Sequence, residues 1–260
     1  MEFRWTMMTP KDLDEAIEHL PLAIVPAGSL EWHGPHLSTG TDFLRGDAIC
    51  MGLAARIGGG VVLPPTWVAA PGFCNWRGTI SFTPALVREV ALELYRELEK
   101  CGFRQIVVYL SHAGSMQEES WGGAAELYRE IGSADVYVTR GLARPTATAM
   151  GGGHAGPEET AQLLAAEPAA VYLDRYDPED TLLPKYTKAD GSQLDAELYS
   201  RGLSEETQAA VEKFMAREHY TWSGDLVEKV TPESAEAHMN EICDLLADEV
   251  RAWMAGESRG

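Results

Sequence analysis

Short apolar runs alternate along this chain with longer amphipathic stretches. Four runs rich in β-branched and other apolar residues are bounded by Gly, Pro or polar residues, as is typical of short buried strands. These predicted strands are residues 20–27, 60–63, 105–111 and 135–139. Apolar residues recur at helical spacing in six other stretches, which are residues 42–56, 84–101, 116–130, 157–166, 204–217 and 232–254. The alternation predicts an α/β fold.

Three Thr-Pro pairs mark positions where helices are expected to begin. Thr9, Thr83 and Thr231 each place a capping hydroxyl directly before a proline, the residue that is favoured at the first helical position. Strands that alternate with helices indicate a mostly parallel sheet covered on both faces. We therefore expect a single three-layer α/β/α domain over residues 1–260.

Residues 168–203 fit this pattern least well. Acidic and other polar side chains crowd there, which predicts an irregular excursion with at most short strands. A long ordered loop in a compact domain is often a lid over a site or a contact between subunits. A surface loop without such a role is the alternative, and the sequence favours neither.

Composition excludes several classes of partner. A chain of 260 residues that is 45% hydrophobic can bury a large core, and its formal charge of −19 disfavours binding to nucleic acid or to an anionic membrane. The four cysteines lack the C-x-x-C spacing of a thiolate zinc site. The first residues do not resemble a secretory signal, and no apolar run approaches the roughly 20 residues of a membrane span. We expect a cytoplasmic protein.

Side chains of metal-ligand type gather directly after the first predicted strand. Glu31, His33, His36 and Asp42 lie in one short segment that is punctuated by glycine and proline. Loops that follow strands are where open α/β sheets hold their chemistry. An ordinary surface loop is the alternative, but four potential ligands on one loop count against it.

The same residue types recur at two later element boundaries. The predicted strand 105–111 runs directly into His112. Three glycines precede His154 just before the predicted helix 157–166, whose first turn contains Glu159. Three separate segments thus place metal-ligand types at the end of a strand or the start of a helix, where their side chains can meet.

Together these blocks resemble the creatininase family of metal-dependent amidohydrolases. They occur in the family's order and extend over most of the chain. The matching blocks are Gly28-Ser-x-Glu31-x-His33-Gly-Pro-His36-Leu with Gly40-Thr-Asp42, then Gly78-Thr-Ile-Ser81, then His112-x-Gly114, then His154-Ala-Gly-x-x-Glu159-Thr160.

The resemblance implies a site for one or two divalent ions per subunit. It assigns Glu31, Asp42 and His112 to one ion. It assigns His33, Asp42 and Glu159 to the other, with Asp42 bridging. Divalent ions lower the pKa of a coordinated water and polarise a carbonyl, which amide hydrolysis requires. Nitrogen and oxygen ligands without thiolate suit Zn, Mn or Fe, and we expect Zn first.

Two further histidines have roles beside these ligands. The resemblance makes His154 the proton shuttle, which takes a proton from the attacking water and gives it to the leaving nitrogen. The alternative, that His154 only caps the following helix, is weaker because histidine is not a preferred capping residue. The position of His36 after Pro35 fits a hydrogen bond to a ligand carboxylate as well as it fits direct ligation.

Two departures from the family pattern argue against creatinine as the substrate. The second position after His112, an acidic metal ligand in creatininase itself, is Gly114 here. Between His112 and His154 the only tryptophan is Trp121, inside a predicted helix, so the tryptophans that clamp creatinine are missing. We expect hydrolysis of a cyclic amide, a formamide or a related ring carbonyl of a small molecule. Members of the family with the His-x-Gly form also act on modified peptides.

Alternatives of other classes remain open. One is the opening of a cyclic polyol ketone by C–C cleavage, and another is a family member that binds metal or a small molecule without catalysis. A phosphorylated substrate is disfavoured, because only Arg45, Arg77 and Arg144 lie near the motifs.

The resemblance also implies assembly. It predicts a ring-like homo-oligomer, specifically a hexamer. Candidate residues for the contacts between subunits are Trp5, Trp222 and residues 168–203.

Overall fold

Four parallel strands form the centre of the molecule in the computed structural model, which describes residues 2–70, 72, 76–141, 147–187, 190, 192 and 204–256. The strands lie in the order β2-β1-β3-β4. Their bounds are β1 Leu22–Ala27, β2 Val61–Val62, β3 Gln105–Leu110 and β4 Asp135–Thr139. β1 pairs with β3 along its whole length, with Leu22 opposite Gln105. All six β1 residues are buried, as expected for a strand covered on both faces.

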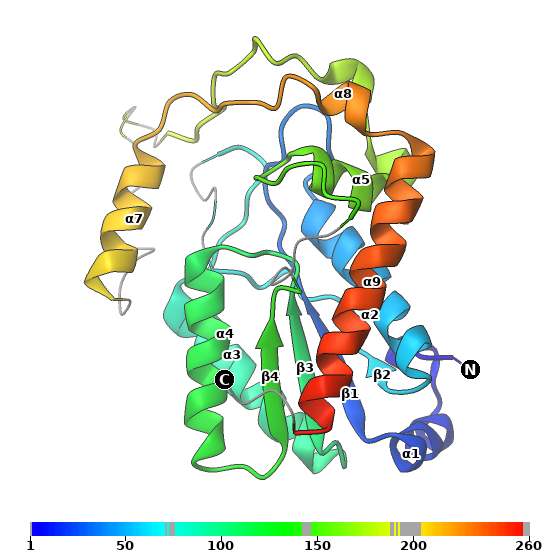
Figure 1. Cartoon of the computed structure of the whole chain (residues 1–260). Coiled ribbons are helices and arrows are strands. Elements are labelled where there is room, and N and C mark those ends of the chain that lie inside the picture. The colour runs from blue at the N-terminus through cyan, green and yellow to red at the C-terminus, as the bar shows by residue number, and fades with distance from the viewer. Residues whose placement is uncertain are drawn as a thin grey trace.

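Helices connect the strands and continue after the last of them (Figure 1). The α-helices are α1 Pro10–His19, α2 Thr41–Ile57, α3 Pro84–Lys100, α4 Ser115–Arg129, α5 Pro157–Ala166, α7 Glu205–Met215, α8 Leu226–Lys229 and α9 Pro232–Met254. Three single turns of 3₁₀ helix are Trp5–Met7, Pro168–Ala170 and Leu173–Arg175.

Two hydrophobic layers cover the sheet, one on each face (Figure 1). Alternate β1 residues point to opposite faces, so that Ala23 and Val25 pack with α3 and α4, whereas Leu22 and Ile24 pack with α2 and α9. Each fully buried large apolar side chain in these layers contributes about 1.5–3 kcal/mol relative to an exposed one. The fold is therefore the three-layer α/β/α domain that the sequence predicts.

The predicted element boundaries agree closely with the structure. The strand at 135–139 and the helices at 157–166 and 232–254 have the predicted bounds, and the other predicted elements differ by a few residues. The short helix α8 is not predicted, because four residues give too little periodicity to detect.

All three predicted helix starts are confirmed. The hydroxyl of Thr9 accepts a hydrogen bond from the backbone of Asp12, and Thr83 and Thr231 accept equivalent bonds at α3 and α9. At α9 the Oγ1 of Thr231 accepts from the backbone N–H of Ser234 at 3.2 Å. The Ser234 hydroxyl in turn meets the backbone of Thr231, which completes a capping box.

The irregular excursion is only partly covered by the structure. Residues 168–187 contain two 3₁₀ turns and isolated bridges, one of which pairs Val171 with Leu37. Of residues 188–203 the structure describes only two, so the prediction of a lid or oligomer contact falls largely outside the described residues. Trp5 and Trp222, considered above for subunit contacts, are each half-buried within the chain, where Trp5 packs against Phe103.

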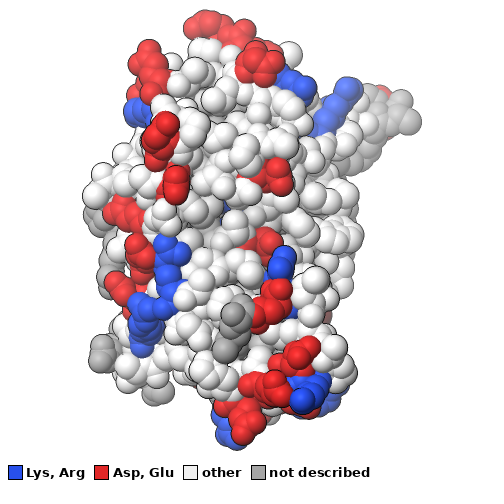
Figure 2. Space-filling view, turned by 90° about the vertical axis from the view of Figure 1, so that its right-hand side faces the viewer, with Lys and Arg blue, Asp and Glu red and all other residues white. Residues whose placement is uncertain are grey.

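Charged side chains are mixed over the face shown in Figure 2. Acidic side chains are spread across it, and the basic ones visible there lie among them. Ion pairs such as Arg56 with Asp244 and Arg251 with Asp248 link α9 to α2 or lie along α9. None of the helices in the described ranges combines the length and apolar character that a bilayer span requires.

Removing the α9 cap tests how the long C-terminal helix is anchored. Thr231→Ala deletes the hydroxyl that satisfies an N-terminal N–H, so we expect a loss of about 1 kcal/mol and a fall in Tm of roughly 2–4 °C. Thr231→Ser keeps the hydroxyl and is the matched control, with a Tm near wild type. Thermal melts followed by circular dichroism measure both variants. An unchanged Tm for Thr231→Ala would show that the cap contributes nothing.

Candidate metal centre

The candidate site lies at the carboxyl edge of the parallel sheet. Glu31 and His33 follow β1, and His112 is the second residue after β3. Asp42 lies in the first turn of α2, and Glu159 lies in the first turn of α5. Segments far apart in the sequence thus meet at the edge where open α/β sheets carry their chemistry.

Two glycines permit the close approaches that build this edge. A Cβ on Gly46 would collide with the side chain of Ser111, so α2 packs against the end of β3 only because residue 46 has none. A Cβ on Gly72 would collide with the carboxylate of Glu31 in the same way. The first approach brings α2, which carries Asp42, next to the segment that carries His112.

Glu31, Asp42 and His112 form a first triad. Nδ1 of His112 lies 3.1 Å from Oε2 of Glu31 and 3.2 Å from Oδ2 of Asp42. The three side chains are at most 5% exposed. One ligand atom from each residue lies within 4.8 Å of the others, which is close enough for a single ion to contact all three.

His33, Asp42 and Glu159 form a second triad that shares Asp42 with the first. Nε2 of His33 lies 3.4 Å from Oδ1 of Asp42 and 3.5 Å from Oε2 of Glu159. Asp42 therefore offers one carboxylate oxygen to each triad. The structure brings together all five residues named as ligands, in the two groups that the resemblance implies, and their binding of metal stays a prediction.

The hydrogen bonds of the two histidines leave their inner nitrogens directed at carboxylates. Nε2–H of His112 donates to the carbonyl of Ala70 at 3.1 Å, and Nδ1–H of His33 donates to the carbonyl of Glu31 at 3.1 Å. Among the described residues, Nε2 of His33 has no hydrogen-bond partner. A ring nitrogen that faces two carboxylate oxygens requires a proton or a metal ion between them. This donor set fits a divalent cation.

The protonation equilibria of these groups reflect the same need for positive charge. Burial opposes ionisation of Glu31, but the imidazoles of His112 and His154 outweigh it and hold the pKa of Glu31 at about 2. Burial also opposes charge on His33, yet Asp42 and Glu159 raise its pKa to about 9. The site thus stabilises the charged form of the carboxylate of Glu31 and the protonated form of the imidazole of His33.

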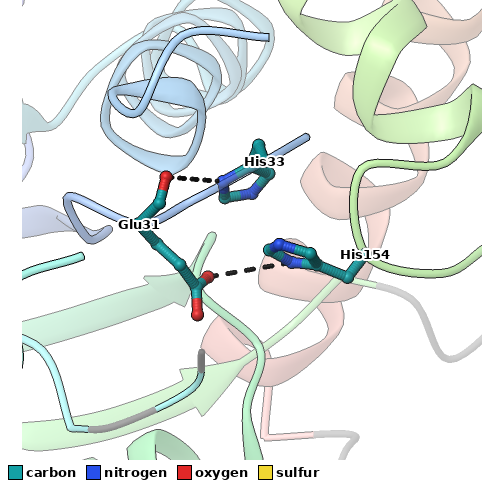
Figure 3. Close-up of side chains that lie close together, drawn as sticks. All are labelled: Glu31, His33 and His154. Atoms are coloured by element: carbon teal, nitrogen blue, oxygen red, sulfur yellow. Dashed lines mark hydrogen bonds and ion pairs between the residues drawn. The ribbon is translucent and has the colours of Figure 1, made fainter. Parts of the chain in front are cut away.

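His154 lies beside Glu31 of the first triad and His33 of the second (Figure 3). Its Nδ1 is 3.8 Å from Oε2 of Glu31, and its ring centroid is 4.2 Å from that of His33. Nε2–H donates to the carbonyl of Trp32, whose indole stacks on the imidazole ring. The N-cap residue of α5 is Gly156, so His154 does not occupy the capping position of that helix.

A cavity of about 460 Å³ opens onto this cluster. Four of the five candidate ligands and His154 line it, and His33 does not. The cavity is also lined by residues that the sequence pattern did not single out, which are Tyr109, Arg140, Gln162, Phe214, Arg217 and Tyr220. They come from β3, the residue after β4, α5, α7 and the segment after α7, and no local motif marks them in the sequence.

His36 differs from both roles considered for it in the sequence, whereas Trp121 and Gly114 lie as the sequence indicated. His36 is buried and belongs to none of the candidate ion groups, and burial lowers its pKa to about 4. Its Nε2 lies 3.4 Å from the Thr160 hydroxyl. Trp121 is buried in α4 against Tyr95, away from the cavity. Gly114 does line the cavity.

The three arginines near the motifs have different environments. Arg45, considered as a phosphate-binding residue, is instead buried against Asp42 and Glu159. Arg77 is exposed, and Arg144 lies outside the described residues. The sequence does contain a signal for Arg45, since it follows Asp42 by three positions on a helix whose later buried positions are glycine or apolar residues.

Comparison with known proteins places this geometry in a family. The creatininase family model, described as creatinine amidohydrolase, matches residues 6–250. A mycofactocin precursor peptide peptidase from Mycobacterium ulcerans (strain Agy99) is 31% identical over 164 residues, which are 60% of this chain and 62% of that protein. The match thus spans about three fifths of the length of that relative.

Solved creatininase structures share the fold. One titled creatininase Mn aligns with a TM-score of 0.67 at 20% identity and covers 97% of this chain and 99% of its own. A glutamate-to-glutamine variant titled Zn-Zn type aligns with a TM-score of 0.69 at 20% identity and covers 97% of this chain and 98% of its own. Because the family model spans nearly the whole chain, this protein belongs to the creatininase family.

Proposed function

We propose that this protein is a metal-dependent hydrolase that cleaves an amide C–N bond. The observation that carries the proposal is the pair of carboxylate and imidazole triads that share Asp42 and border one cavity beside His154. An enzyme of this kind needs charge stabilisation, a proton carrier and room for a carbonyl in one place. Family membership supports a hydrolase in general, and the amide bond is the further step.

The described ligands suit a divalent ion of the zinc, manganese or iron type. A bound ion of this type supplies an activated water and a polarised carbonyl. Glu31, Asp42 and His112 would hold the first ion, and His33 and Glu159 would join Asp42 around a second. The ligand atoms are nitrogen and oxygen only, which leaves zinc as our first expectation and manganese or iron as alternatives.

The contacts of His154 support a role in proton transfer. Its Nε2–H is committed to the carbonyl of Trp32, so that in the neutral ring Nδ1 carries the lone pair on the side of Glu31. The hydroxyl of Tyr220 donates to the backbone carbonyl of His154 at 2.6 Å, which fixes the loop that carries the ring. His154 Nδ1 would accept the proton of the attacking water and return it to the leaving nitrogen.

The cavity favours substrates other than creatinine. The position that follows His112 by two is glycine, and Trp121 packs away from the cavity, so its walls differ from those expected for creatinine. A cyclic amide or formamide of a small molecule is our first substrate class. A short peptide is the second, and two observations favour it. The 31% identical relative is named as a peptide peptidase, and Arg140 and Arg217 line the cavity where a carboxylate could bind.

A hydrolysis screen tests the proposal. Purified protein loaded with Zn²⁺ or Mn²⁺ is incubated with lactams, formamides, creatinine and short peptides that end in a free or an amidated carboxylate, and products are followed by mass spectrometry. Release of an amine from any of these, absent in Asp42→Ala, supports the function. Preference for peptides with a free carboxylate selects the second substrate class. No turnover by a metal-loaded protein would support a family member that binds without catalysis.

Metal analysis of two variants tests the ligand assignment. Asp42→Ala removes the residue common to both triads, so we expect less than a tenth of the wild-type metal after desalting. His33→Ala removes a ligand of the second triad only and should keep the ion held by Glu31, Asp42 and His112. Elemental analysis of both variants gives the answer, with circular dichroism to check folding. Wild-type metal content in Asp42→Ala would disprove the shared-ligand assignment.

Replacing His154 separates proton transfer from metal binding. If His154 carries the proton, His154→Ala should retain metal and fold while turnover falls roughly 10²–10⁴-fold, the usual loss for a general acid or base. Since Nδ1 of His154 also lies near Glu31 and His33, metal content must be measured on the same sample. Loss of metal together with activity would make His154 a ligand instead.

The pH profile provides an independent check on His154. Burial, aided by neighbouring His33, lowers the pKa of His154 below its ordinary value of about 6.5 despite the nearby carboxylates. A base must be neutral, so the wild-type rate should rise with pH through this pKa and level off above it. His154→Ala should lack that acidic limb. A limb that persists unchanged in the variant would assign the titration to another group.

A further inference from the structure

Arg45 is a buried cation inside the candidate metal centre. Its side chain is 6% exposed. Nε and Nη2 donate to Oδ1 of Asp42 at 3.2 and 3.0 Å, and Nη2 also donates to Oε1 of Glu159 at 3.0 Å. The backbone carbonyl of Ser111 accepts a further bond from Nη2. The charge of Arg45 is therefore shared between the two carboxylates of the second triad.

A chain of hydrogen bonds holds Arg45 in this position. Nη1 donates to Oε1 of Gln162 at 2.6 Å, and the amide nitrogen of Gln162 lies 3.3 Å from Nε2 of His238. Nδ1 of His238 is in turn 3.0 Å from the hydroxyl of Thr148. Because the amide nitrogen faces His238, the amide oxygen faces Arg45. The guanidinium is thus held by the carboxylates of Asp42 and Glu159 on one side and by Gln162 on the other. Moving it would break a buried network of hydrogen bonds.

Arg45 donates hydrogen bonds to the carboxylate oxygens of the second triad and not to those that face His112 in the first. Oδ1 of Asp42, the oxygen that faces His33, receives two bonds from Arg45. Oδ2, the oxygen that faces His112, receives a bond from the neutral hydroxyl of Ser29 at 2.7 Å. Glu31, which completes the first triad, has no ion pair with Arg45 among the described contacts.

The charges of the buried groups limit how many ions can be held tightly. Three carboxylates against one guanidinium leave two negative charges, which a single divalent ion balances when the histidines are neutral ligands. A second divalent ion would leave the buried centre with two positive charges. Like charges a few ångströms apart in a medium of reduced dielectric repel strongly.

We propose that Arg45 makes this centre asymmetric, with one ion bound tightly by Glu31, Asp42 and His112 and a second bound weakly by His33, Asp42 and Glu159. The inference rests on the proposed function, in which these residues bind divalent metal. Arg45 acts through Asp42 and Glu159 and is a positioning residue. If Arg45 only oriented the two carboxylates, replacing it would weaken binding of the second ion. If its positive charge opposes that ion, removing the charge should strengthen binding of the second ion.

Titration of the metal-free full-length protein with Mn²⁺, with free ion followed by electron paramagnetic resonance, tests this. Wild type should bind in two steps whose dissociation constants differ by ~100-fold or more. Arg45→Gln, which removes the charge, should tighten the second step by ~10-fold or more and change the first step less. Arg45→Lys keeps a charge and should behave as wild type.

Other outcomes have distinct meanings. Two wild-type steps of equal affinity, or a second step that weakens in Arg45→Gln, would overturn the asymmetry while leaving metal binding in place. Absence of any Mn²⁺ binding would refute the metal centre itself, and this inference with it. If Arg45→Gln fails to fold by circular dichroism, Glu159→Gln replaces it. That variant should lose the weak step and keep the tight one, and loss of the tight step would contradict the proposal.

Discussion

The gathering of three carboxylates at one point, two of them buried and one partly buried, is the constraint on which the rest of this site depends. Glu31, Asp42 and Glu159 would repel one another in a medium of low dielectric unless cations lay between them. The protein supplies one cation permanently as Arg45 and directs the inner nitrogens of His33 and His112 at carboxylate oxygens. A divalent ion completes this balance. A bound ion would therefore also stabilise the folded carboxyl edge of the sheet, at which these residues meet.

The fold brings these groups together in two ways, through the shared edge of its parallel strands and through close packing of a helix. A parallel sheet places every strand end at one edge, so the segments after β1 and β3 meet without long loops. Close packing does the rest, since the absence of a side chain at Gly46 lets α2 rest on the end of β3. Larger residues there would separate Asp42 from His112. Gly46 matters here because it permits a short distance between α2 and the end of β3, and not because it makes the backbone flexible.

Sequence reasoning predicted the fold and the cluster because both depend on local signals. Strand and helix periodicity and Thr-Pro starts are written within short windows, and the ligand residues lie at element ends. The partners of those ligands are another matter. Gln162 and His238 join Arg45 from helices far along the chain, and Phe214 and Tyr220 reach the cavity from the segment around α7. Such contacts depend on tertiary packing, which periodicity does not encode.

Shared fold and shared ligand types do not make the site equivalent to that of creatininase. The aligned creatininase structures are about 20% identical to this chain, a level at which the fold is common and the chemistry must be argued from residues. Here the cavity wall has Gly114 two residues after His112, and Arg45 places a buried positive charge beside Glu159. Both features limit the negative charge available to a second ion.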